Sequence, residues 1–141
     1  MEKREFDFFK DHSERFLQMA LSADRQEAIS RPDGYGKNIG DCGDTVEIFL
    51  KVRNGCIEHA SYRIEGCINT NACANAVVHM VEGKSVAAAW KITPDAVIED
   101  LKTLPKESSH CAELAVGALY RALANHVELK KEPWKKGYPT R

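Results

Sequence analysis

The chain has 141 residues, 43% of them hydrophobic and 29% charged, a length and balance typical of one globular domain. Its 20 basic and 21 acidic residues leave a formal net charge of -1, which argues against general binding to nucleic acid or anionic lipid. No apolar run reaches the length of a membrane span, and the first residues do not resemble a signal peptide. We therefore expect a cytoplasmic protein with neither membrane nor nucleic-acid partners.

The first predicted element is an amphipathic helix over residues 3–24, where apolar side chains recur at helical spacing between charged ones. Residues 31–40 contain three glycines and one proline, which predicts an irregular or weakly paired segment and at most a short strand. We expect one domain over residues 1–129 with its core at 31–126. The remaining residues, 130–141, lack an apolar period and contain two prolines, which predicts a tail.

A β-hairpin is predicted next. Apolar and polar residues alternate over 45–52, which is typical of a strand with one buried face. Asn54 and Gly55 then favour a two-residue type I′ turn, because both residues tolerate positive φ. Residues 56–65 are expected to return as the antiparallel partner.

The second half of the chain is predicted to be helical, with caps and breakers that separate the helices. The expected helices are residues 71–82 before Gly83, a short helix from the Ser85 cap through Trp90, a helix from the Thr93–Pro94 cap to about Lys102, and a helix from a Ser108 or Ser109 cap through Val127, after the break at Leu104–Pro105.

Five cysteines in a chain without an export signal indicate metal binding or thiol chemistry rather than disulfides. Cys42, Gly43 and Asp44 place a thiol and a carboxylate on either side of a glycine, which lets the backbone turn so that both side chains face one ion. A thiolate and a carboxylate differ in softness, so this pair would hold a metal without locking it in place.

Two further cysteines lie near predicted helix starts. Cys67 follows Gly66 at a strand-to-helix junction, and Cys111 follows His110 at the start of the last helix. Such positions lower the pKa of a thiol and favour the thiolate, which is the form that binds metal or accepts sulfur. We expect these two thiols to converge with the Cys42–Asp44 pair.

The alternative interpretation is that the cysteines are small buried hydrophobic residues. Cys56 directly follows the hairpin turn without a neighbouring ligand type and is not counted as a ligand. Cys73 follows Cys67 by six residues, which on a continuous helix would place it about 120° around the axis and argues against ligation.

The order and separation of these motifs resemble those of the NifU N-terminal and IscU family of iron-sulfur cluster scaffolds. The resemblance covers roughly residues 31–126. Its matched features are Cys42–Gly43–Asp44 with the strand that follows, the Asn54–Gly55 hairpin, Gly66–Cys67, Glu82–Gly83–Lys84, Leu104–Pro105 and His110–Cys111.

This resemblance implies an α+β fold of the SufE/NifU type, with a small antiparallel β-sheet covered by helices. It implies a solvent-accessible site at which Cys42, Cys67 and Cys111 converge, Asp44 tunes the lability of the cluster, and His110 is an alternative ligand. A scaffold of this kind is not an enzyme: it receives sulfur from a cysteine desulfurase, builds a transient [2Fe-2S] cluster and passes it to apoproteins. Zn²⁺ occupies the same site in this family when no cluster is present, and a homodimer is a further expectation.

Two departures from the family pattern change these expectations. Lys106, Glu107 and Ser108 follow Leu104–Pro105 where typical IscU proteins carry Pro-Val-Lys as the site for a dedicated Hsp70 chaperone, which argues against that partner. Cys73 adds a thiol near the site, for which we hypothesise a role in sulfur relay.

Two other functions stay open at this point. One is a zinc-dependent sulfurtransferase of the SufU branch, although that branch carries an insertion before its last cysteine and lacks the adjacent histidine. The other is a structural zinc site within an interaction module.

Overall fold

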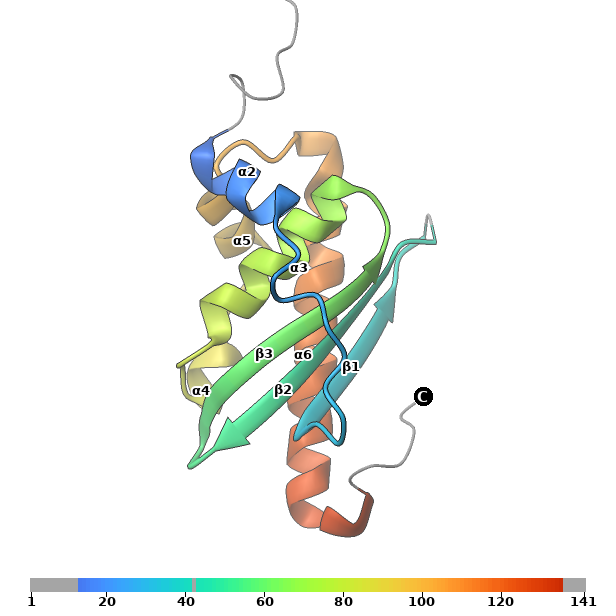
Figure 1. Ribbon diagram of the computed structural model, residues 1–141, viewed down its shortest axis with the longest axis vertical. Helices are drawn as coiled ribbons and strands as arrows, with labels where there is room; N and C mark the ends of the chain where they lie inside the picture. Colours follow the sequence, from blue (N-terminus) through green and yellow to red (C-terminus); the bar gives the residue numbers. More distant parts are fainter. Residues whose placement is uncertain (1–12, 42, 136–141) are drawn as a thin grey trace, which may run out of the picture.

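The computed structural model describes residues 13–41 and 43–135. The elements in chain order are α2 (Glu14–Leu21), β1 (Gly34–Ile39), β2 (Thr45–Arg53), β3 (Cys56–Glu65), α3 (Ile68–Val81), α4 (Val86–Ala89), α5 (Pro94–Leu101), the 3₁₀ helix η1 (Lys106–Ser108), α6 (Ser109–Lys131) and the 3₁₀ helix η2 (Pro133–Lys135). The strands form one antiparallel sheet in the order β1-β2-β3. Helices α3 and α6 cover one face of it, and α2 and α5 pack against them (Figure 1). The predicted α+β class is confirmed.

The hairpin between β2 and β3 follows its prediction closely. Asn54 and Gly55 have φ values of 52° and 75°, as a type I′ turn requires. The alternation predicted for β2 is also present, since Val46, Ile48 and Leu50 are fully buried against the helices. Local sequence chemistry therefore determines this part of the sheet.

Strand β1 is short, as the sequence allowed, but its regular pairing corrects the expectation of an irregular or weakly paired segment. It pairs without interruption along β2, from Gly34 opposite Leu50 to Ile39 opposite Thr45. Its glycines serve close packing instead, because a Cβ added at Gly36 would lie 2.3 Å from the carbonyl oxygen of Ala118 in α6. The missing side chains let β1 lie directly against α6.

Helix α2 is shorter than predicted at both ends. It begins at Glu14, because Ser13 is extended with ψ of 154° and caps the helix, and it ends at Leu21, because Ser22 is extended with ψ of 141°. Residues 3–12 of the predicted helix lie outside the described residues. Two side-chain amides from α3, those of Asn71 and Asn75, donate hydrogen bonds to carbonyls at this end. The helix end is therefore capped by another helix rather than by its own sequence.

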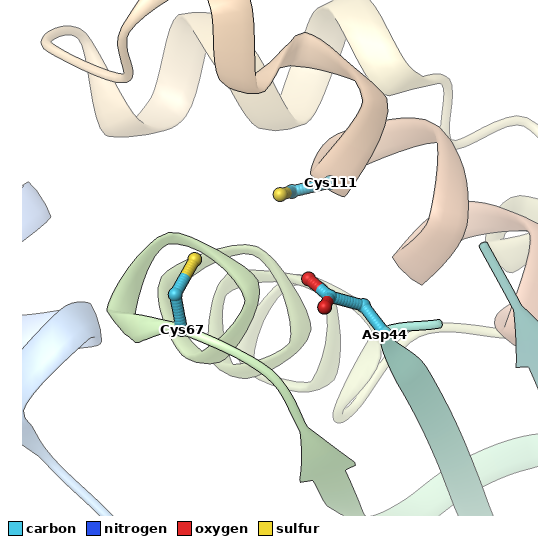
Figure 2. A group of neighbouring side chains, drawn as sticks. All are labelled: Asp44, Cys67 and Cys111. Atoms are coloured by element: carbon cyan, nitrogen blue, oxygen red, sulfur yellow. The ribbon is translucent and has the colours of Figure 1, made fainter. Parts of the chain in front are cut away.

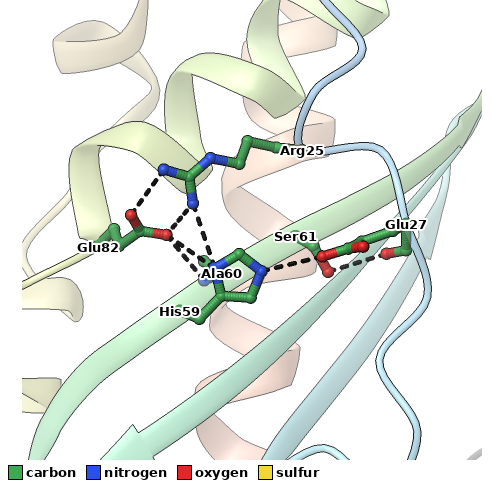
Figure 3. Close-up of polar contacts among 6 residues, drawn as sticks. All are labelled: Arg25, Glu27, His59, Ala60, Ser61 and Glu82. Carbon is green, nitrogen blue, oxygen red and sulfur yellow. Dashed lines mark hydrogen bonds and ion pairs between the residues drawn. The ribbon is translucent and has the colours of Figure 1, made fainter.

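The segment between α2 and β1 runs across the face of the sheet opposite to the helices (Figure 1). A polar cluster fastens its start to β3 and to the end of α3 (Figure 3). The Arg25 guanidinium binds both carboxylate oxygens of Glu82, with Nη2 to Oε1 at 2.7 Å, and these bonds lower the pKa of Glu82. The His59 ring lies between two carboxylates, with Nδ1 3.2 Å from Glu82 Oε2 and Nε2 3.1 Å from Glu27 Oε1.

The short helices begin as predicted. The Ser85 hydroxyl accepts a hydrogen bond from the Ala88 amide at 3.1 Å and caps α4. The Thr93 hydroxyl accepts one from the Ala96 amide at 3.2 Å and caps α5.

Within the part of the chain that the structure describes, no helix combines the length and apolarity needed to cross a membrane.

The two long helices differ from prediction at their ends. Helix α3 begins at Ile68, three residues before the predicted start, with Cys67 as its N-cap. Helix α6 begins at Ser109 but is not capped by the Ser108 side chain, and it continues to Lys131, into the stretch predicted as a tail. The earlier start of α3 matters most for function, because it puts Cys67 at the helix end.

Candidate metal centre

Three potential ligands meet at one end of the sheet. Asp44 immediately precedes β2, Cys67 is the N-cap residue of α3 two positions after the end of β3, and Cys111 lies in the first turn of α6. A carboxylate oxygen of Asp44 and the two Sγ atoms all lie within 4.8 Å of one another. Figure 2 shows the three side chains pointing toward a common space. The convergence expected from the sequence is present for these three residues.

The site is open on one side. Cys111 is buried, with 1% of its surface exposed, whereas Asp44 is half-buried and Cys67 is exposed. Both cysteines are present as thiols rather than in disulfides. The site thus combines soft thiolate ligands with a hard carboxylate ligand, and its exposed side is accessible to a partner molecule.

Thr70 lies at the centre of this group and was not identified from the sequence. Its hydroxyl donates a hydrogen bond to Asp44 Oδ2 at 2.8 Å and lies 3.7 Å from the Sγ atoms of Cys67 and Cys111. The available signal was its position three residues after the N-cap cysteine, a spacing at which N-cap and helix side chains meet.

The first turn of α3 also sets the acidity of Cys67. Partial burial acts to raise the pKa of its thiol, and the nearby Asp44 acts in the same direction. Hydrogen bonds from the backbone N–H groups of Thr70 and Asn69 favour the thiolate and act against both, and the pKa of Cys67 is lowered. This direction agrees with the expectation for a thiol at a helix N-terminus.

Two further features fix the spacing of the site. The Asn69 amide Nδ2 donates a hydrogen bond to Ser108 Oγ at 3.0 Å, which ties the start of α3 to the turn before α6. Gly66 leaves room beside Asp44, because a Cβ there would lie 2.8 Å from Thr70 Oγ1 and 3.0 Å from Asp44 Oδ2. The hydrogen bond fixes the start of α3 relative to α6, and the absence of a side chain at Gly66 lets Asp44 lie close to Thr70.

His110 lies beside the site but outside the group of three. Its Nδ1 is 3.0 Å from the carbonyl oxygen of Glu107, which cannot donate, so Nδ1 carries a proton and donates it. The other nitrogen, Nε2, lies 3.6 Å from Cys111 Sγ. This tautomer fits the predicted role of His110 as an alternative ligand, which stays a prediction.

The remaining cysteines have different surroundings. Cys42 lies outside the described residues, so its predicted ligation stays a prediction. Cys73 is fully buried, and burial together with the nearby Cys111 and Cys67 raises the pKa of its thiol, which disfavours the hypothesised sulfur relay. Cys56 is exposed at the start of β3 and lies outside the site, in agreement with its exclusion as a ligand.

Comparison with known proteins connects this chain to a family. The model of the NifU-like N-terminal domain family matches residues 25–133. A protein of Archaeoglobus fulgidus named iron-sulfur cluster assembly scaffold protein IscU 1 is 39% identical over 100 residues, which cover 70% of this chain. The match spans 65% of that relative's own length, slightly less than two thirds.

Two solved structures have a similar fold. A NifU-like protein (N-terminal) from Brucella abortus matches with a TM-score of 0.68 at 17% identity, over 82% of this chain and 94% of its own. A SufU protein from Fervidobacterium islandicum AW-1 matches with a TM-score of 0.66 at 16% identity, over 83% and 99%. At such low identity the likeness concerns the fold, and it agrees with the predicted SufE/NifU-type architecture.

Proposed function

The chain belongs to the NifU-like N-terminal domain family, and from this membership we propose that it is a scaffold, not an enzyme, on which iron-sulfur clusters are built for other proteins. The observation that carries the proposal is the meeting of Asp44, Cys67 and Cys111 within 4.8 Å at an open end of the fold. The Archaeoglobus relative, which is named a cluster assembly scaffold, supports the same function.

The ligand types fit a cargo that must leave. Iron-sulfur clusters are held by cysteine thiolates, which Cys67 and Cys111 supply. An oxygen ligand is the least favourable partner for a softer metal, so Asp44 is the weak member of the set and the route of release. The cluster is thereby held long enough to form and is then passed on.

Cys42 completes this proposed set as a third thiolate, because it stands two residues before Asp44 in the chain. The product is a transient [2Fe-2S] cluster, with His110 as an alternative ligand whose Nε2 faces Cys111. Zn²⁺ suits the same thiolate and carboxylate donors, which would hold it in the isolated protein when no cluster is present.

Sulfur arrives from a cysteine desulfurase, and Cys67 is suited to accept it because its thiol is exposed and its pKa is lowered. The Cys67 thiolate attacks the outer sulfur of the donor's persulfide. A new S–S bond forms to Cys67 while the donor's S–S bond breaks, and the donor cysteine leaves as a thiolate, so the transfer needs no external electrons. Apoproteins that take up the finished cluster are the other class of partner.

Anaerobic reconstitution with iron and sulfide tests this function. The wild-type protein should develop the visible absorption of a [2Fe-2S] cluster and lose it to an apoprotein acceptor. Asp44→Ala should hold a more persistent cluster, because its weakest ligand no longer offers a route of exit; this lifetime is a kinetic property, distinct from the equilibrium affinity of the site for a single metal ion. The control is Asp41→Ala, which removes an exposed carboxylate of the same loop and should leave the lifetime of the cluster unchanged.

A shorter cluster lifetime in Asp44→Ala would contradict the role of the carboxylate. A zinc-dependent sulfurtransferase is the second candidate function, favoured by the same exposed thiol, whose pKa is lowered, at Cys67. The sulfurtransferase function would be supported if the wild-type protein formed no visible cluster, retained zinc tightly and accepted persulfide sulfur.

A further inference from the structure

Thr70 is a buried polar residue that contacts all three of the converging ligands, Asp44, Cys67 and Cys111. Its side chain is fully buried in the first turn of α3. The hydroxyl donates to Asp44 Oδ2 at 2.8 Å, and the same oxygen lies 3.7 Å from Cys67 Sγ and from Cys111 Sγ. Buried hydroxyls are usually hydrogen-bonded, but contact with three candidate ligands from separate parts of the chain goes beyond that requirement.

The hydrogen-bonding capacity of a hydroxyl decides how Thr70 serves these ligands. A threonine hydroxyl has one proton to donate and two lone pairs to accept with. In the metal-free site the proton goes to Asp44 and the lone pairs can accept from the two thiols. When both thiols bind a metal they lose their protons, so the bond to the Asp44 oxygen, the shortest of the three contacts, is the one that Thr70 keeps.

This bond restricts the carboxylate. One oxygen of Asp44 is held by Thr70, which favours coordination of a metal through a single oxygen and fixes the direction of the side chain. Asp44 is half-buried and precedes the first residue of β2, so without the bond it can turn toward solvent. Thr70, in contrast, is held by a helix packed within the core.

The backbone beside the pair leaves space for it. A Cβ at Gly66 would lie 2.8 Å from Thr70 Oγ1 and 3.0 Å from Asp44 Oδ2, closer than side chains normally approach. The absence of a side chain at Gly66 is therefore needed for this hydrogen bond as it stands. Helix position, burial and the space at Gly66 all hold the same arrangement.

We propose that Thr70 is a positioning residue that holds the Asp44 carboxylate toward the two thiols, and so sets how tightly the site binds a metal. This inference rests on the metal-binding site of the proposed function. It requires no cluster assembly, however, so it can be tested with a metal ion alone.

The test compares Thr70→Val, which keeps the shape of the side chain and removes the hydroxyl, with Thr70→Ser, which keeps the hydroxyl. Each protein is titrated anaerobically with Co²⁺, whose visible absorption reports both affinity and ligand geometry. Removing a group that orients a metal ligand costs about 10- to 100-fold in affinity, so the dissociation constant of Thr70→Val should rise by at least about tenfold. Thr70→Ser should restore wild-type affinity and spectrum.

A double-mutant cycle shows whether Thr70 acts through Asp44. In an Asp44→Ala background, Thr70→Val should cause no further loss of Co²⁺ affinity, because the carboxylate that it positions is gone. The proposal is overturned if Thr70→Val binds Co²⁺ like the wild type, or if its loss is equally large without Asp44.

The same cycle is measured on the metal-free proteins by urea unfolding. The shifts in the unfolding midpoint should be non-additive for Thr70→Val and Asp44→Ala, and additive shifts would refute the positioning bond itself. Wild-type protein that binds Co²⁺ normally but assembles no cluster would refute the scaffold function and leave the role of Thr70 intact. Wild-type protein that binds no Co²⁺ would overturn both the metal site and the role of Thr70 in it.

Discussion

Replacing Asn71 with alanine should separate the end of α2 from α3 and weaken the framework that holds Cys67. Asn71 is buried, with 8% of its surface exposed. Its Oδ1 accepts a hydrogen bond from the Tyr62 hydroxyl at 2.7 Å. Its Nδ2 donates to three carbonyl oxygens at the end of α2, those of Met19 at 3.1 Å, Ala20 at 3.0 Å and Ser22 at 3.0 Å.

The expected loss follows from these bonds. The amide has two hydrogens and accepts one hydrogen bond from Tyr62, so Asn71 makes three bonds of full strength. At a net contribution of about 1 kcal/mol each, Asn71→Ala should lower the free energy of unfolding by about 3 kcal/mol. That is a large part of the roughly 5–15 kcal/mol of a typical domain.

Asn75→Ala is the matched control, because it removes the same atoms from a buried position one turn further along α3. Asn75 Nδ2 makes longer contacts, 3.2 Å to Met19 and 3.4 Å to Ser22, and its Oδ1 has no hydrogen-bond partner among the described residues. Its truncation removes weak bonds together with an unsatisfied acceptor, so it should cost about 1 kcal/mol or less.

Urea unfolding of the metal-free proteins, followed by circular dichroism, measures both changes. With a denaturant dependence of about 2 kcal/mol/M, the midpoint of Asn71→Ala should fall by about 1.5 M, against about 0.5 M or less for Asn75→Ala. Equal shifts for the two variants would refute the reasoning, because the loss would then reflect only a cavity in α3.

Two further predictions concern the site and alkaline stability. Gly66→Ala should displace Asp44 from Thr70 and lower the affinity for Co²⁺ about tenfold. The control is Gly40→Ala, whose added Cβ meets Leu114 at the ordinary contact distance of 3.5 Å and should leave the affinity unchanged. Equal affinities of the two variants would contradict the packing argument. Burial raises the pKa of Tyr62 from 10.0 to about 12, so the folded state holds this proton more tightly than the unfolded chain. The free energy of unfolding should therefore be unaffected by this group below pH 10 and should decline from pH 10 toward pH 12. Urea unfolding measured across this range should show a smaller decline with pH for Tyr62→Phe than for the wild type. An equal decline in the two proteins would assign the loss to other groups.

Several parts of the fold could be predicted from the sequence because their causes are local. The hairpin depends on alternation along β2 and on two neighbouring residues that accept positive φ, Asn54 and Gly55. Helices α4 and α5 depend on hydroxyl caps at Ser85 and Thr93 that bond within three residues. In each case the interacting groups are close in the chain, so their types and spacing suffice.

The misread elements depend on contacts between distant segments. The glycines of β1 predicted irregular backbone, but Gly36 is needed where the strand lies against Ala118 of α6. The end of α2 is set by Asn71 and Asn75 of α3, whereas its own residues continued the helical pattern. No local pattern contains the partner that decides these positions.

The candidate site divides in the same way. Residue types, motif order and family resemblance identified Asp44, Cys67 and Cys111 in advance, because ligand chemistry is a property of side chains. Only the tertiary structure put their ligand atoms within 4.8 Å of one another and placed Thr70 among them, since those distances arise from the packing of α3 and α6 on the sheet. It also made Cys67 exposed and Cys73 buried, because a helix end faces solvent while its inner face packs into the core.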